Sequence, residues 1–322
     1  MDVKCDFLYN KQNLSVSEIR TENYLRLDDV EYFVSYLSSD YKSNKGGNSF
    51  VYALYEAQTY DEDAIPAKVI KISKFHESYK NGKIRTKDKN KRFRQEVAAL
   101  YDCKRKHVGN VIDIESDGNL ICRTRKDGDY EVSFPFYVME YAEFDLKGFL
   151  EEENEAYDEA SCVELCLQIA QGIKELNDLG YYHRDIKPDN IFMINGTWKV
   201  GDLGLIQMRN KPSLDREGEL VGPRGWLSPE AMNKYLSENV EGRNFDCNID
   251  HQSDLFQLAK VFWYILQGNA PIGCVKESDF LLHNSSLYSL IKQMLNHSKK
   301  RRPASVDIVI NDLQIIVNKY YK

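Results

Sequence analysis

The chain has 322 residues, with 43 Lys and Arg against 50 Asp and Glu, so its formal net charge is −7. Hydrophobic residues make up 42% and charged residues 29%, a mix typical of a soluble globular protein and unlike a disordered or collagen-like chain. The acidic balance argues against a general nucleic-acid binder, which needs surplus Lys and Arg to neutralise phosphates.

No stretch is predicted to cross a membrane, because the most apolar run, residues 258–266, carries Lys260 and a spanning helix needs about 20 apolar residues. The first residues lack the apolar core of a signal peptide, and Asp2 stands where N-myristoylation needs glycine. The seven scattered cysteines form no Cys-x-x-Cys pair, so reduced thiols in a cytoplasmic protein are the simplest interpretation.

From about residue 32 to residue 140, short runs rich in Val, Ile, Tyr and Phe predict strands and hairpins. One helix is predicted over about 91–104, and residues 126–129 are a candidate hairpin turn. Residues 1–35 show no clean period, so they are expected to add a strand or a helix to this half. The basic stretch 80–94 is interpreted as a solvated loop and helix start in preference to a docking surface.

After Tyr141 the pattern becomes helical. A capping box at residues 161–164 predicts a helix start, and Gly180 is suited to end that helix in a left-handed conformation. A second helix is predicted over about 254–267, followed by Gly268. The predicted fold class is therefore α+β, with a strand-rich half and a helix-rich half.

Residues 183–190, His-Arg-Asp-Ile-Lys-Pro-Asp-Asn, follow a predicted helix and precede an apolar strand, so they lie on a loop. The loop holds the carboxylate of Asp185, the ammonium of Lys187 and the amide of Asn190, and Asp202 follows after the next strand. Two oxygen donors at adjacent strand ends can share a hard cation such as Mg²⁺. Phosphoryl transfer needs these parts: a carboxylate for the attacking hydroxyl, metal ions and a lysine for the phosphate charge.

This loop resembles the catalytic loop of eukaryotic-type protein kinases, and the chain from about Tyr36 onward follows that family's order of motifs. The resemblance implies a bilobal protein-kinase-like fold. A small antiparallel N-lobe with one αC helix would span residues 36–141, and a larger, mainly helical C-lobe would span residues 142–322, with residues 1–35 as an N-terminal extension. It also implies that Asp185 is the catalytic base and that Lys187 stabilises the γ-phosphate. The Mg²⁺ ligands would be Asn190 and Asp202.

Upstream, a segment of small residues resembles the family's glycine-rich loop, although Asn44 and Ser49 fill the first and third glycine positions. The resemblance assigns the ATP phosphates to Gly46, Gly47 and Ser49, and it places Val51 over the adenine. Small residues suit this role because they let backbone N–H groups approach a phosphate closely.

The strand lysine that holds the α- and β-phosphates has two candidates, Lys68 and Lys71. They are three residues apart, so a strand points them to opposite faces. Lys71 is favoured because Val69 then packs on the adenine, whereas choosing Lys68 gives that place to Pro66, which suits a strand interior poorly. Its expected partner is Glu96 on the αC helix.

Residues 136–142 resemble the last N-lobe strand and the hinge to the C-lobe. Met139 would stand at the back of the adenine pocket, and Asp145 would reach a ribose hydroxyl. The further ATP-site residues that the resemblance implies are Glu140, Ala142 and Phe192.

Residues 222–230 resemble the end of the kinase activation segment. The resemblance pairs Glu230 with Arg302 and lets Asp254 hold the backbone of the catalytic loop. These features separate protein kinases from small-molecule phosphotransferases.

The type of acceptor residue has two opposing signals. Pro223 and Trp226 are typical of tyrosine kinases, whereas Lys187 followed by Pro188 is typical of serine/threonine kinases. The catalytic loop is weighted more heavily because Lys187 lies beside the transferring phosphate. The expected function is ATP- and Mg²⁺-dependent transfer to Ser or Thr of protein substrates. A catalytically impaired scaffold and a tyrosine or dual-specificity kinase are the alternatives.

Between Asp202 and Glu230 the sequence offers few hydroxyl groups for activating phosphorylation. Arg184, which in the family binds such a phosphate, would then need another anion. The hypothesis is that Glu217 or Glu219 supplies a carboxylate in its place, and the alternative is that both are solvated loop acids.

Overall fold

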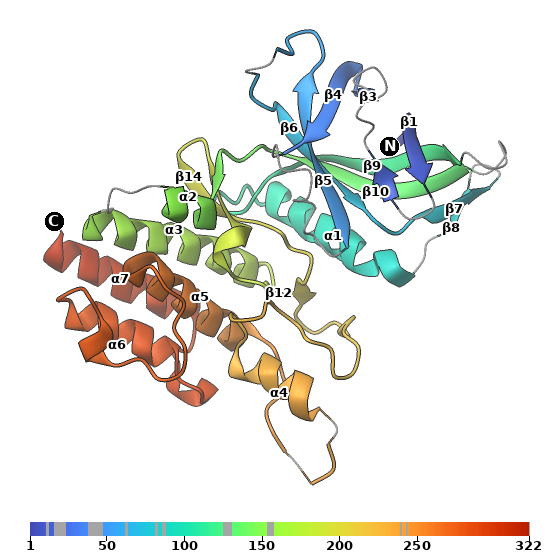
Figure 1. Cartoon of the computed structure of the whole chain (residues 1–322). Coiled ribbons are helices and arrows are strands. Elements are labelled where there is room, and N and C mark those ends of the chain that lie inside the picture. The colour runs from blue at the N-terminus through green and yellow to red at the C-terminus, as the bar shows by residue number, and fades with distance from the viewer. Residues whose placement is uncertain are drawn as a thin grey trace. The chain divides into compact units, whose positions relative to one another are not determined.

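The computed structural model describes the whole chain apart from residues 11–12, 16–23, 38–47, 62–63, 81–82, 86–87, 125–130, 153–157, 239, 243 and 322. The predicted hairpin turn at residues 126–129 lies outside the described residues. The chain forms two compact units, which we call the N-terminal unit and the C-terminal unit (Figure 1). The N-terminal unit comprises Met1–Tyr101 and Asp113–Tyr141, and the C-terminal unit comprises Asp102–Ile112 and Ala142–Lys322.

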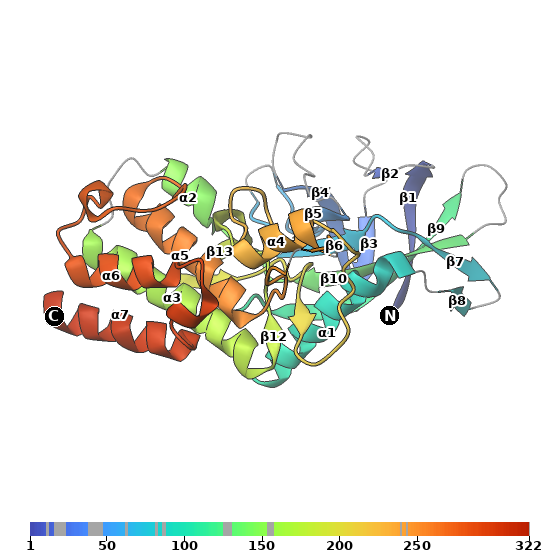
Figure 2. The same cartoon turned by 90° about the horizontal axis from the view of Figure 1, so that it is seen from below.

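The N-terminal unit is built on one sheet, whose strands run in the order β2-β1-β9-β10-β6-β5-β4-β3, with β7 joining β10 to β8. Its strands are β1 (Asp2–Asn10), β2 (Asn13–Ser15), β3 (Tyr24–Leu27), β4 (Val30–Tyr36), β5 (Ser49–Glu56), β6 (Lys68–Ser73), β7 (Glu77–Lys80), β8 (Lys83–Arg85), β9 (Ile114–Thr124) and β10 (Glu131–Met139). A short η2 turn (Asp88–Asn90) leads into the helix α1 (Lys91–Arg105). Figure 2 shows β7 and β8 as a separate hairpin on this sheet.

Alternation along the central strands separates a core face from the face that carries Lys71. Ile70 and Ile72 of β6 are fully buried in the sheet's own hydrophobic core. Lys71 lies between them and points to the opposite face, where Tyr137 of β10 is its partner in register. Because a strand has a side-chain period of two, this register is what brings Lys71 and Tyr137 together.

The described part of residues 1–35 adds strands, which settles the choice between strand and helix that the sequence leaves open there. β3 pairs antiparallel with β4, and β1 pairs parallel with β9. The approach of β1 is close at Gly118, where an added Cβ would lie 2.1 Å from the carbonyl oxygen of Met1. A side chain at position 118 would therefore push the start of β1 away.

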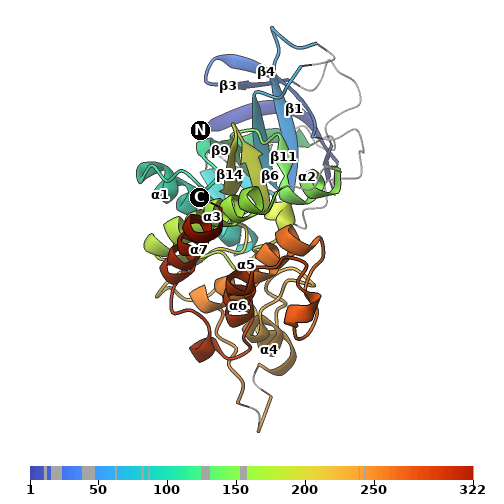
Figure 3. The same ribbon diagram turned by 90° about the vertical axis from the view of Figure 1, so that its left-hand side faces the viewer.

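The C-terminal unit is mainly helical, and α5 is buried along most of its length. Its helices are α2 (Leu146–Glu152), α3 (Glu159–Asp178), α4 (Pro229–Ser237), α5 (His251–Gln267), α6 (Ser285–Met294) and α7 (Val306–Tyr320). Its short strands and turns are β11 (Phe144–Asp145), β12 (Tyr181–Tyr182), η3 (Pro188–Asn190), β13 (Ile191–Ile194), β14 (Thr197–Val200), β15 (Gln207–Met208), η4 (Glu277–Asp279) and η5 (Lys299–Arg301). Figure 3 shows α7 beside α3, and the two helices are in contact. No helix in the described parts of the chain is both long and apolar enough to cross a membrane.

Capping residues mark where α3 and α5 begin and end, and the predicted start of α3 is wrong. The N-cap of α3 is Asp158, whose carboxylate accepts the Ser161 N–H at 2.8 Å, so the helix begins before the predicted capping box. Gly180 has a φ of +82° and follows the end of this helix, as predicted. For α5 the capping box is formed by Asp250 and Ser253, and Gly268 ends the helix at a φ of +71°.

A glycine in α3 lets another backbone segment support β14. Val200 donates its N–H to the Asn110 carbonyl at 2.8 Å, and Ile112 donates to the Val200 carbonyl at 2.9 Å. An added Cβ at Gly172 would lie 2.4 Å from the Asn110 carbonyl oxygen. This packing fixes the strand that leads to Asp202.

Candidate active site

In the N-terminal unit, Lys71 and Glu96 form a buried ion pair. The Lys71 ammonium donates to Glu96 Oε1 at 2.7 Å, and the two side chains are 9% and 2% exposed. Lys68 points to the other face, where it pairs with Glu115 and lies 5.5 Å from the centre of the Tyr32 ring. Of the two candidate lysines, Lys71 is thus the one that pairs with Glu96.

Tyr137 contacts both residues of this ion pair, and the sequence analysis missed it. Its hydroxyl donates to Glu96 Oε1 at 3.0 Å, and the Lys71 ammonium lies 5.8 Å from the centre of its ring. Tyr137 is 1% exposed. The available signal was its position two residues before Met139, on the same strand face, but only the register with β6 shows that it meets Lys71.

Part of the predicted nucleotide site in this unit lies outside the described residues, namely Asn44, Gly46 and Gly47. Ser49 begins β5 and is buried, and Val51 stands opposite Lys71 in register. At the end of β10, Met139 is half-buried.

Glu140, which follows β10, is tied to the segment that leads into β9. Its carboxylate accepts the Asp113 N–H at 2.7 Å, and its own N–H donates to the Asp113 carbonyl at 3.3 Å. These two bonds fix the end of β10, where the resemblance places the adenine edge.

In the C-terminal unit, Asp254 of α5 holds the backbone of the catalytic loop, which is the role predicted for it. Its two carboxylate oxygens accept the N–H groups of His183 and Arg184, each at 2.8 Å. Burial raises the pKa of Asp254 to about 7, although these N–H donors oppose the rise. Arg184 has a φ of +67°, a conformation that costs energy for a residue with a Cβ and persists only where its surroundings impose it.

The loop's functional groups are held by bonds within the loop and from α5. Asn190 donates its amide N–H groups to the carbonyl of Asp185 at 2.8 Å and to the carboxylate of Asp185 at 2.9 Å. Gln257 accepts the Ile186 N–H at 3.2 Å, a contact that the sequence did not indicate. Lys187 is half-buried between these anchored residues.

His183 connects the catalytic loop to the segment before Asp202. Its Nδ1 accepts the Asp185 N–H at 3.2 Å, so its Nε2 carries the proton and donates to the Gly201 carbonyl at 3.1 Å. Burial lowers the pKa of His183 to about 4, against the opposing charge of Asp202. The ring is therefore a neutral bridge. Asp202 itself has a φ of +50°.

The donor chemistry of Asn190 and Asp202 fits a magnesium ion. The side-chain N–H groups of Asn190 both bind Asp185. The side-chain oxygen of Asn190 is therefore the atom that would coordinate a metal, and Asp202 offers a carboxylate. The Gly201 N–H donates to the backbone carbonyl of Asn190 at 2.9 Å. Asp202 follows Gly201 directly, so Asn190 and Asp202 lie on neighbouring segments that are bonded to each other. Mg²⁺ prefers such oxygen donors and keeps several waters.

The remaining predicted ATP-site residues of this unit lie around β11 and β13. Asp145 and Phe192 are partners in register, and Asp145 Oδ1 accepts the Gly148 N–H at 2.7 Å, which caps α2. An added Cβ at Gly201 would lie 2.8 Å from the Phe192 ring. Ala142 is half-buried just before β11.

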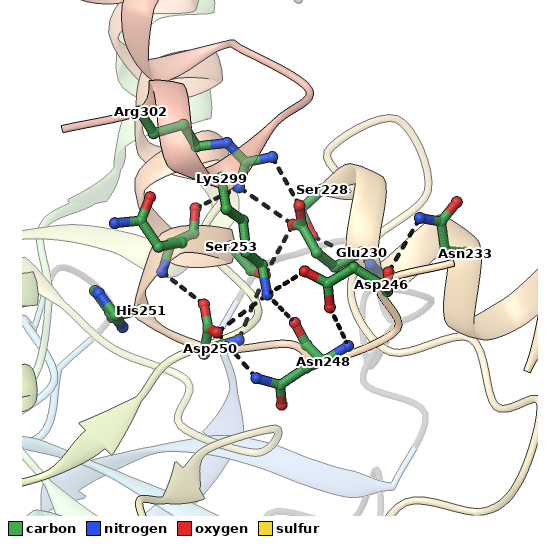
Figure 4. A network of polar contacts seen from close by, with 12 residues as sticks. Ser228, Glu230, Asn233, Asp246, Asn248, Asp250, His251, Ser253, Lys299 and Arg302 are labelled. Atoms are coloured by element: carbon green, nitrogen blue, oxygen red, sulfur yellow. Dashed lines mark hydrogen bonds and ion pairs between the residues drawn. The ribbon is translucent and has the colours of Figure 1, made fainter. Parts of the chain in front are cut away.

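Glu230 and Arg302 form the predicted ion pair, shown in Figure 4. Arg302 binds both carboxylate oxygens of Glu230, at 2.8 and 3.2 Å, and donates its other hydrogens to the carbonyls of Asn296, Gln252 and His297. The Arg302 side chain is 0% exposed. All five donors of the guanidinium are thus satisfied.

A second cation, Lys299, joins this network to the segment before α5. Its ammonium lies 3.1 Å from the Asp246 carboxylate and 3.0 Å from the Asp250 carboxylate, and it also binds the Asn248 carbonyl (Figure 4). Since Asp250 caps α5, the network supports the helix that carries Asp254.

The carboxylate that meets Arg184 is Asp215, and the prediction of Glu217 or Glu219 is wrong. Arg184 donates to the two oxygens of Asp215 at 2.7 and 2.8 Å, and both side chains are 3% exposed. Ser213 Oγ accepts the Asp215 N–H at 3.1 Å, a local turn that directs Asp215 inward. Glu219 instead accepts the Arg216 N–H at 2.8 Å, and Glu217 is exposed.

A model of the protein kinase domain matches residues 45–313, so the chain belongs to the protein kinase domain family. The strand-rich and helix-rich units agree with the predicted α+β, bilobal fold class of that family. The chain is 27% identical to the Schizosaccharomyces pombe sensor for unfolded proteins in the ER ire1, over 66% of this chain and 23% of that protein.

Other relatives are kinases by name. The chain is 25% identical to the eIF-2-alpha kinase GCN2 of Arabidopsis thaliana, over 70% of this chain and 22% of that protein. It is 35% identical to the serine/threonine-protein kinase cds1 of S. pombe, over 48% of this chain and 32% of that protein. The chain thus covers a third or less of the length of each of these relatives.

Tyr137→Phe removes only the hydroxyl that binds Glu96. A hydrogen bond to a charged group contributes about 1.5–3 kcal/mol, so we expect the affinity for MgATP, measured by calorimetry, to fall at least about tenfold. The matched control is Tyr101→Phe, because the Tyr101 hydroxyl also donates to a carboxylate, that of Asp117 at 2.9 Å. Equal affinities of the Tyr137→Phe and Tyr101→Phe chains would contradict the role given to Tyr137.

Arg302→Met leaves the buried Glu230 carboxylate without its cation. We expect a loss of about 3–5 kcal/mol in the free energy of unfolding, measured with denaturant. Adding Glu230→Gln to Arg302→Met should restore part of this loss, because no unpaired charge remains. Arg26→Met, which breaks the exposed Arg26–Asp29 pair, should change stability by under about 1 kcal/mol. An Arg302→Met effect no larger than this control would rule out the structural role.

Proposed function

We propose that the chain is a protein kinase that transfers the γ-phosphate of ATP to Ser or Thr of protein substrates, with Mg²⁺ as cofactor. The proposal rests on the catalytic loop, where Asn190 holds the Asp185 carboxylate and Asp254 holds the loop backbone. The buried Asp254 carboxylate holds Arg184 in a left-handed backbone conformation that costs energy. Such strain is typical of functional sites.

The proposed roles divide between the two units. Asp185 orients the attacking hydroxyl and receives its proton, Lys187 stabilises the charge of the γ-phosphate, and Lys71 holds the α- and β-phosphates. Asn190 and Asp202 would hold Mg²⁺, which supplies positive charge to the phosphate oxygens when bound. Catalysis is then mainly positioning and charge stabilisation.

A serine or threonine acceptor is supported by Lys187 and Pro188, and by relatives whose names identify them as serine/threonine kinases. The opposing signal lies in the activation segment, where the Trp226 ring packs edge-on against Tyr264 at 5.7 Å. This packing accounts for Trp226 as a structural residue of the C-terminal unit, which reduces its weight as an indicator of tyrosine specificity.

We also infer that the kinase is active without phosphorylation of its activation segment. The Asp215 carboxylate binds the Arg184 guanidinium through two parallel bonds, the geometry by which Arg recognises phosphate groups. Arg184 Nε also donates to the Leu205 carbonyl at 2.8 Å. The guanidinium thereby ties two points of the activation segment to the catalytic loop.

Incubation of the full chain with ATP and Mg²⁺, followed by mass spectrometry of the chain and of a peptide library, tests the proposed function. We expect phosphate on Ser or Thr, and a loss of at least about a thousandfold in Asp185→Asn, because the group that orients the nucleophile is gone. Phosphotyrosine would correct the acceptor type. An inactive wild-type chain that still binds MgATP would identify the scaffold alternative.

Asp215→Asn keeps the shape of the side chain and removes the charge that neutralises Arg184. We expect kcat to fall at least about tenfold, since an uncompensated buried charge loosens the segment, while Glu217→Gln and Glu219→Gln retain wild-type kcat. Intact-mass measurement should show wild-type activity in chains that carry no phosphate on the activation segment. Full activity of Asp215→Asn, or activity only after phosphorylation of the segment, would overturn the inference.

A further inference from the structure

The N-terminal unit buries a second acidic side chain, that of Glu77. Glu77 lies at the start of β7 and is 0% exposed. One of its oxygens accepts the Asn90 amide at 2.8 Å, and the other accepts the Arg94 guanidinium at 2.8 Å. A buried carboxylate is tolerated only when such donors compensate it.

Asn90 is the centre of this cluster, and its other bonds reach the end of β6 and the residues just after it. The Ser73 hydroxyl donates to Asn90 Oδ1 at 2.6 Å, and the Asn90 amide also donates to the Phe75 carbonyl at 2.8 Å. The Phe75 N–H in turn donates to Ser73 Oγ at 3.1 Å. We call the group Ser73, Glu77, Asn90 and Arg94 the β6–α1 junction.

The junction joins the two elements that carry the nucleotide ion pair. Ser73 lies two residues after Lys71 on β6, and Arg94 lies two residues before Glu96 on α1. Glu77 is anchored independently, because β7 pairs with β10 and Glu77 stands opposite Ser133. The start of α1 is therefore tied both to β6, which carries Lys71, and through Glu77 and β7 to β10, which carries Tyr137.

We propose that Glu77 is a positioning residue for the phosphoryl transfer, which rests on the function proposed above. By holding Asn90 and Arg94 it fixes the start of α1 on the sheet, so that Glu96 reaches Lys71. The start of the helix thus receives this support from within the N-terminal unit. Glu77 touches neither nucleotide nor substrate and acts only through Glu96.

Glu77→Gln tests the proposal, because it keeps the side-chain shape and removes the charge that Arg94 binds. In the nucleotide-free full chain we expect faster hydrogen exchange along α1. Calorimetry with MgATP should show an affinity about tenfold lower, as expected when Lys71 loses its orienting partner. The matched control is Glu115→Gln, which breaks the partly exposed Lys68 pair of the same unit and should match the wild-type chain in both measurements.

A double-mutant cycle separates positioning from general stability. In a Lys71→Met chain, Glu77→Gln should still speed exchange in α1 but cause no further loss of MgATP affinity, because its effect passes through Lys71. Additive losses, or unchanged α1 exchange in Glu77→Gln, would overturn the proposal.

The α1 exchange does not depend on catalysis, so it decides the role of Glu77 even if the wild-type chain transfers no phosphate. Should Glu77→Gln fail to fold, Arg94→Met replaces it, since that side chain is 42% exposed and its loss removes only one arm of the junction. Additive losses of MgATP affinity with Lys71→Met, or unchanged hydrogen exchange in α1, would then overturn the proposal in the same way.

Discussion

The two bonds from the Asp254 carboxylate to the catalytic-loop backbone are the constraint on which the C-terminal unit's site depends. They hold Arg184 at a positive φ, and this backbone conformation sends its guanidinium toward the activation segment, to Leu205 and Asp215. A carboxylate on α5 is therefore linked, through Arg184, to a segment more than twenty residues further along the chain. Asp185 follows Arg184 directly, so the same two bonds also restrict its position.

Buried charges recur in both units, and three of them, Arg302, Glu77 and Arg184, are each held by more than one bond. Arg302 uses all five donors, Glu77 has a donor on each oxygen, and Arg184 meets Asp215 through two bonds. Such groups add little net stability over apolar residues of the same size. Any arrangement that leaves one of the charges buried without its partner is nevertheless strongly destabilised. The pairs thus favour one placement of α1, of the catalytic loop and of the activation segment over slightly displaced alternatives.

Sequence patterns predicted those features that depend on local order along the chain. Strand parity separated Lys71 from Lys68, and the motif order indicated Glu96, Asp254 and Arg302. Tyr137 was missed because its partner Lys71 is set by the register between β10 and β6, which no local pattern encodes. Glu77 was missed because its partners, Asn90 and Arg94, meet it only when α1 packs against the sheet. Asp215 was missed because its direction depends on a turn formed with Ser213 and on the backbone of Arg184. For residues 1–35 the sequence left strand and helix open, since β1 pairs with the distant strand β9, a partner that no local pattern indicates.

The parallel pairing of β1 also has a consequence for how the protein behaves at high concentration. Without β1, one side of the eleven-residue β9 would present a long row of unpaired N–H and C=O groups, a template on which another chain could add a strand. In the described part of the sheet, the terminal strands are instead β2 and β8, each of three residues, and β3, of four. Strands this short offer a foreign chain few bonds, so the part of β1 before Leu8, with which β2 does not pair, is the border where we expect such a strand to add.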